Sequence, residues 1–128
     1  MATWLDLTGY VRSNYKIADE QSNSIRMVFD TGDLRSQVVL LWRQVIGNDE
    51  WLQIESPIGE ASSVNLQQAL EEAGRLVCGG LMIDGGHVFM RHAVPLVNLN
   101  INEFEQPLHL VTTSADLLEE KLVGGDRY

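Results

Sequence analysis

Residues 24–55, SIRMVFDTGDLRSQVVLLWRQVIGNDEWLQIE, decide the fold. In residues 24–30 apolar and polar side chains alternate, which is typical of a half-buried strand whose inner side carries Ile25, Met27 and Phe29. Residues 31–33 supply turn chemistry, and residues 37–46 then form a longer strand with a nearly continuous apolar run. We therefore expect that longer strand to be central and covered on both faces, at least over its first half.

The chain turns again at residues 47–50, and residues 51–55 form a third strand. Ser56 and Pro57 end it, because proline has no backbone N–H to donate to a sheet. Since short turns join all three strands, the sequence predicts an antiparallel meander.

Three segments show the 3.6-residue period of an amphipathic helix. In residues 3–14, with Thr3 as N-cap, the apolar stripe comprises Trp4, Leu7 and Val11. The second stripe follows an N-cap at Ser62 or Ser63, ends at Gly79-Gly80, and comprises Leu66, Ala69, Leu70, Ala73 and Val77. We expect the third helix to begin near Gln106, because Pro107 suits a first turn, and its stripe comprises Phe104, Leu108, Val111, Ala115, Leu118 and Leu122.

Residues 81–83 and 87–96 flank the connection Asp84-Gly85-Gly86, which predicts a β-hairpin. The element order is then α-β-β-β-α-β-β-α, in a single domain over residues 1–128. We predict an α+β fold, with a mainly antiparallel sheet of about five strands and three helices.

The charge balance excludes several classes of partner. Nine Lys and Arg residues against eighteen Asp and Glu residues give a net charge of −9 and a pI near 4.6. Such a surface repels phosphates, and the basic residues are scattered singly, so we expect neither nucleic acid nor a membrane as partner. The amino terminus lacks the basic and apolar regions of a signal peptide, and Cys78 is the single cysteine, so we expect a cytoplasmic protein without an intrachain disulfide.

No catalytic or cofactor motif emerges from the polar residues. His87 and His92 fall on opposite faces of one strand, and His109 lies on another element, so we expect no metal site. The two glycine pairs, Gly79-Gly80 and Gly85-Gly86, are not followed by lysine and so do not form a phosphate-binding loop. We therefore expect no catalytic residue, no metal and no cofactor, and we interpret Cys78 as a small buried hydrophobe.

The apolar residues that alternate away from the expected core are more informative. If Ile25, Met27 and Phe29 face the helices, the opposite side carries Val28, Trp51, Phe89, and either Leu41 or Trp42. A patch of that kind, ringed by Arg26, Asp30, Glu55 and Arg91, marks a protein contact rather than an enzyme site. The alternative is that the second helix covers this side, in which case the same residues are core.

The element order resembles that of the YbjN-like domain. The same resemblance extends to residues 81–96, with LMI at 81–83 and VFMRHAVPL at 88–96, which lead into Phe104 and an apolar helix. That group is in turn similar to the small acidic class I chaperones of type III secretion systems. The resemblance implies a protein without enzymatic activity, usually a homodimer, that binds another polypeptide. In the secretion chaperones the bound segment is largely extended, lies in apolar grooves and can pair with an exposed sheet edge.

Three functional hypotheses result, of which the third is a purely structural subunit of a larger assembly. The leading one is a cytoplasmic, homodimeric, chaperone-like module for an unidentified protein or peptide client, with the client bound by Val28, Trp42, Trp51, Phe89 and Arg91. Its dimer interface would use the second helix or the neighbouring hairpin, with contacts from Leu66, Leu70, Ala73 and Val77. The alternative is a small ligand-binding regulator or enzyme with a pocket between sheet and helices, whose polar groups would be His87, Arg91 and His92.

Overall fold

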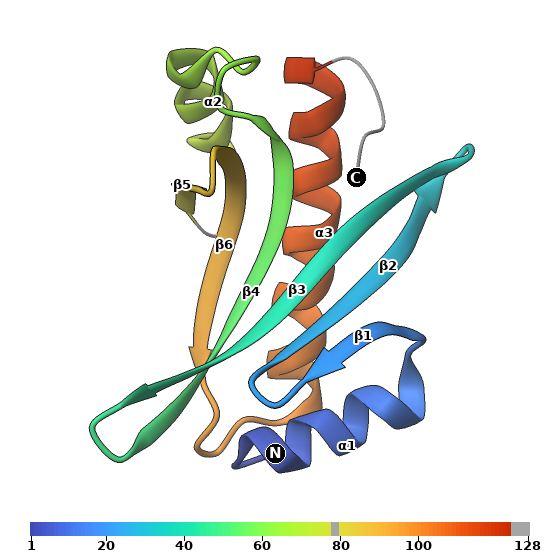
Figure 1. The fold of residues 1–128 in the computed structure, drawn as a ribbon, viewed down its shortest axis with the longest axis vertical. Helices are drawn as coiled ribbons and strands as arrows, with labels where there is room; N and C mark the ends of the chain where they lie inside the picture. Colours follow the sequence, from blue (N-terminus) through green and yellow to red (C-terminus); the bar gives the residue numbers. More distant parts are fainter. Residues whose placement is uncertain (78–79, 124–128) are drawn as a thin grey trace.

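The computed structural model describes residues 1–77 and 80–123. Within these ranges the elements are, in order, α1 (Trp4–Asn14), β1 (Ile17–Gln21), β2 (Ser24–Gly32), β3 (Arg35–Ile46), β4 (Asp49–Glu60), α2 (Leu66–Ala73), β5 (Gly80–Asp84), β6 (His87–Pro95) and α3 (Ile101–Val123). The strands form one sheet in the order β1-β2-β3-β4-β6-β5, with every neighbouring pair antiparallel. The predicted α+β class is confirmed (Figure 1).

Tight turns set the register of the long strands. Asp33 and Leu34 carry positive φ angles of 35° and 65° between β2 and β3, and Gly85 and Gly86 do the same, at 57° and 79°, between β5 and β6. The predicted hairpin around Asp84-Gly85-Gly86 is therefore confirmed. Left-handed backbone at both central residues matches the right-handed twist of the flanking strands.

One face of the sheet holds the core. Helix α3 runs along this face in contact with β4, β6, β3 and β2, and α1 closes its lower end, as Figure 1 shows. The fully buried large side chains of this layer include Leu7, Ile25, Met27, Leu41, Leu52, Ile54, Met90, Phe104, Leu108 and Leu118. They come from the stripes predicted for the first and third helices, from one face of each predicted strand of the meander and, for Met90, from the second strand of the predicted hairpin.

Strand β3 is central, but the prediction that its first half is covered on both faces was wrong. Its buried residues are Gln37, Val39 and Leu41, whereas Val38 and Leu40 are half-buried and Trp42 is exposed. A continuous apolar run therefore does not mean two covered faces here, because the helices of the described chain gather on the other side of the sheet.

Two strand predictions need correction. The polar residues 19–23 are typical of a turn, but residues 17–21 form the edge strand β1, in which Asp19 pairs with Arg26 and Gln21 with Ser24. Charged side chains are usual on a sheet edge because they discourage pairing with further chains. The sheet within the described residues thus has six strands, and the order is α-β-β-β-β-α-β-β-α.

Strand β4 does not end at Pro57 but continues to Glu60 through a register shift between Pro57 and Gly59. Proline is tolerated at such an irregularity, and the Pro57 carbonyl accepts a hydrogen bond of 2.7 Å from the buried Gln37 amide. Gly59 is required beside it, since a Cβ there would lie 2.7 Å from a side-chain carbon of Val123 and 2.9 Å from one of Val64. This close approach lets α3 pack against the strand.

Both later helices differ from prediction at their ends. Helix α2 is capped by Asn65, whose Oδ1 accepts from the Gln68 N–H at 3.0 Å, rather than by Ser62 or Ser63, and it ends at Ala73 with Gly74 as C-cap. Val77 consequently lies outside the helix, and Cys78 and Gly79 lie outside the described residues.

Helix α3 begins at Ile101, not near Gln106, and contains Pro107. Asn100 and Glu103 start it with a reciprocal capping box: the Glu103 N–H donates to Asn100 Oδ1 at 2.8 Å, and the Asn100 N–H donates to Glu103 Oε1 at 3.0 Å. Of the helices in residues 1–77 and 80–123, none is long and apolar enough to cross a membrane.

Candidate functional site

The face of the sheet opposite α3 is called the open face below. Cross-strand register places its side chains in rows, one of which runs Ser24, Trp42, Gln53, Ala93 and the next Arg26, Leu40, Glu55, Arg91. Because side chains alternate along a strand, Trp51 and Phe89 belong to the same face. The open face is therefore a mixture of aromatic, aliphatic and charged groups, displayed by four adjacent strands.

All five residues predicted to bind a client lie on this open face. Val28 is 48% and Trp42 40% exposed, and Trp51, Phe89 and Arg91 are half-buried. Leu41 is fully buried on the other side, so Trp42 completes the patch. The second helix contacts β5 and α3 instead of lying across this patch, which decides against the alternative in which these residues are core.

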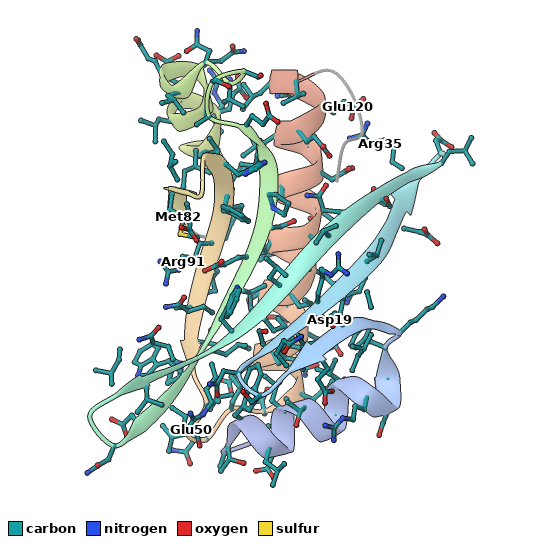
Figure 2. The ribbon with its side chains drawn as sticks, in the orientation of Figure 1. Asp19, Arg35, Glu50, Met82, Arg91 and Glu120 are labelled. Carbon is teal, nitrogen blue, oxygen red and sulfur yellow. The ribbon has the colours of Figure 1, made fainter. Side chains whose placement is uncertain are left out.

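A hollow of about 390 Å³ lies within the open face, and we call it the sheet hollow. It is bounded by β3, β4, β5 and β6, and the side chains that line it include Trp42, Gln53, Glu55, Met82, Asp84 and Arg91. Figure 2 shows Met82 and Arg91 side by side at the outer strands, and Arg91 Nη1 lies 3.4 Å from Met82 Sδ. A thioether is a weak acceptor, so most of the hydrogen-bonding capacity of this guanidinium is left for water or a ligand.

Glu55 is the least expected member of the sheet hollow. Predicted at the rim of the patch, its side chain is only 8% exposed, and its Oε2 lies 3.4 Å from Arg91 Nε. Burial raises the pKa of Glu55 above its ordinary value, the Arg91 charge opposes that shift, and the Asp84 charge adds to it. The carboxylate is thus poorly solvated and only loosely paired.

A second apolar surface involves the residues predicted for the dimer interface. Leu70 is 63% and Val77 90% exposed, Leu66 is also exposed, and Ala73 is half-buried. Leu66 and Leu70 of α2, together with Leu81 and Ile83 of β5, line an apolar groove of about 130 Å³, called the α2–β5 groove below. Strand β5 is an edge of the sheet, so backbone groups lie next to this groove without a strand beyond them in the described chain.

The three histidine side chains lie at separate places in the structure. His87 shares the open face with Arg91 and has a ring nitrogen 3.2 Å from the Gly85 carbonyl, whereas His92 faces the helices and lines a hollow of about 320 Å³ between β6 and α3. His109 pairs with Glu105 within α3, at 3.2 Å. Among the residues that the structure describes, no three His, Cys, Asp or Glu side chains are grouped so that they could hold a metal ion.

The sequence predicted Val28 and the aromatic members of the open face, but Leu40, Gln53, Met82 and Asp84 were not predicted there. Alternation along each strand is visible in the sequence, and it identifies which residues share a face. The order in which the strands pair is not visible in the sequence. It is the β4-β6-β5 pairing that brings Met82 and Asp84 beside Glu55.

Comparison with protein-family models, with curated proteins and with solved structures gave no match for this chain. Its function is therefore inferred from the geometry of its two apolar surfaces.

Proposed function

We propose that this protein is a non-enzymatic, chaperone-like module that binds another polypeptide on its open face and acts as a homodimer. The observation that carries the proposal is the exposure of Val28 and Trp42 on a sheet face from which the helices of the described chain are absent. Aromatic residues and arginine are enriched where proteins bind one another, and this face offers Trp42, Trp51, Phe89 and Arg91 together.

The α2–β5 groove supports the homodimer. Leu66 and Leu70 are exposed beside this groove, whereas the exposed Val77 lines the hollow between β6 and α3. Strand β5 can pair with a second copy of itself along its free edge. A net charge of −9 keeps copies soluble while they display apolar surface. In this proposal the dimer uses the α2–β5 side and leaves both open faces available for clients.

The proposal extends to the family and the location. The chain would be a YbjN-like domain, similar to the class I secretion chaperones, and would act in the cytoplasm. An antiparallel sheet with three helices in the described residues supports the resemblance. Strand β1 is a departure from the element order on which the resemblance was based.

Two measurements test the proposal. Light scattering on purified protein should give the mass of a dimer, and a monomer at tens of micromolar would count heavily against the dimeric part. Purification from the native cell followed by mass spectrometry should identify a stoichiometric polypeptide partner. Turnover of a small molecule by the purified protein would overturn the non-enzymatic part.

A second candidate function is a small-ligand-binding regulator. The hollow between β6 and α3 favours it, because His92 and Glu103 offer polar groups beside the apolar Val94 and Leu110. A thermal-shift screen against metabolites separates the two candidates, since a ligand at a hundredfold its Kd stabilises the folded state by about 2.7 kcal/mol. The three polar groups expected to form that pocket are not assembled, however, because His87 and Arg91 point to the other face from His92.

A further inference from the structure

The Glu55 carboxylate is a largely buried anion with one long ion pair in the described part of the chain. Its Oε2 lies 3.4 Å from Arg91 Nε, which is longer than a good charge-assisted hydrogen bond. The side chain is more than nine-tenths buried, yet it lines the sheet hollow and so faces the surface where a client would lie. A buried carboxylate normally accepts several hydrogen bonds, because desolvation without them is costly.

The walls of the sheet hollow suit a cation. Asp84 adds a second carboxylate that has no ion pair in the described part of the chain, so two carboxylates face the single guanidinium of Arg91. Arg43 also borders the hollow, but its Nε is held by the Glu50 carboxylate at 2.7 Å. Trp42 contributes an indole, the ring that attracts cations most strongly, and Gln53 contributes an amide oxygen.

We propose that the sheet hollow receives the lysine or arginine side chain of a polypeptide bound to the open face, with Glu55 and Asp84 as its carboxylate partners and Trp42 against its aliphatic stem. This inference rests on the proposed function, since it names the chemistry by which the client is recognised. The bound cation completes the solvation of Glu55, and the net charge of −9 attracts basic segments from a distance. An acidic client side chain is disfavoured by the same two carboxylates.

The test uses three fluorescently labelled peptides with blocked ends, of sequence LSLSXSLSL, in which X is arginine, glutamine or glutamate. Alternation keeps X and the flanking leucines on one side of an extended chain. We expect the arginine peptide to bind about tenfold more tightly than the glutamine peptide, the factor that one charge-assisted hydrogen bond is worth. The glutamate peptide should bind most weakly, and the preference for arginine should decrease as salt is added.

Glu55→Gln should reduce the preference for arginine over glutamine to about twofold or less, measured as the ratio of the two affinities for the same variant. The matched control is Glu120→Gln, which removes the same charge from an exposed position on α3, far from the sheet hollow (Figure 2). Circular dichroism melting of both variants checks that they are folded.

The possible results distinguish recognition of a cation in the sheet hollow from peptide binding on the open face. If the wild-type protein binds the arginine and glutamine peptides equally, or if Glu55→Gln keeps the full preference, the inference about the sheet hollow is wrong while peptide binding on the open face stands. Tightest binding of the glutamate peptide would also overturn it, since Arg91 would then be the recognising group. If no peptide of the set binds, both this inference and the peptide-binding function are contradicted.

Discussion

Leu70→Asp should dissociate the proposed homodimer without unfolding the subunit. Leu70 is 63% exposed in the single chain, on the α2–β5 groove. Complete burial of a leucine side chain is worth roughly 1.5–3 kcal/mol, so covering the exposed part contributes about 1–2 kcal/mol. A twofold interface uses each residue twice, which gives about 2–4 kcal/mol per dimer, or about 30- to 1000-fold in the dissociation constant.

The same substitution should change the stability of the subunit itself by only about 1 kcal/mol, because the Leu70 side chain is mostly in water before the dimer forms. The assay is sedimentation equilibrium from low to high micromolar concentration, with thermal melting of each variant at the lowest concentration. Leu5→Asp is the control, since Leu5 is even more exposed but lies on α1, at the other end of the molecule from α2 (Figure 1). Equal dissociation constants for wild type and Leu70→Asp would refute the interface, and so would an unfolded variant.

Three further predictions concern the sheet and its anchoring. Leu41→Ala should lower the free energy of unfolding by about 2–5 kcal/mol, because Leu41 faces the core. Trp42→Ala should lower it clearly less, because Trp42 faces the open side of the sheet. Urea denaturation measures both values, and a larger loss at Trp42 would reverse the assignment of faces. Glu55→Gln should be more stable than wild type at neutral pH. The pKa of Glu55 is raised in the folded state, so wild type loses stability as the pH rises above 4.5, the ordinary pKa of a glutamate. Melting from pH 4 to 8 should show the difference disappearing in acid, and a difference independent of pH would contradict this. Tyr15→Phe should cost about 1.5–3 kcal/mol, since the hydroxyl donates to the Glu105 carboxylate and so ties the end of α1 to α3. Burial, then that bond, raise the pKa of Tyr15, so wild type should lose more stability above pH 10 than the variant, which keeps only the raised pKa of Tyr10 on the same carboxylate. Matching alkaline profiles of the two proteins would show that the contact is absent.

The predictable part of the fold is the part that repeats. Alternation at Ile25 and Met27, and the helical stripe through Phe104 and Leu118, identified core residues correctly, because a side chain's face follows from its spacing alone. Turn residues such as Gly85-Gly86 were equally informative, since few residues tolerate a positive φ.

The features that were missed depend on partners distant in sequence. Residues 17–21, of which 19–21 are polar, form a strand because the edge of β2 is available to pair with them. Strand β4 continues beyond Pro57, where the Gln37 side chain donates a hydrogen bond to the Pro57 carbonyl. No local sequence pattern predicts this contact. Glu55 was expected at the rim for the same reason, since its burial arises from neighbours on β5 and β6 that sequence order does not place.

Purification from the native cell with wild type, Trp42→Ser and Leu5→Ser tests the central claim most directly, namely that the open face binds another polypeptide. Trp42 and Leu5 are both exposed apolar residues, but only Trp42 lies on the open face. We predict that wild type and Leu5→Ser retain the same stoichiometric polypeptide and that Trp42→Ser, although folded, loses it. Equal retention by Trp42→Ser, or the absence of any polypeptide from the wild-type preparation, would contradict the claim.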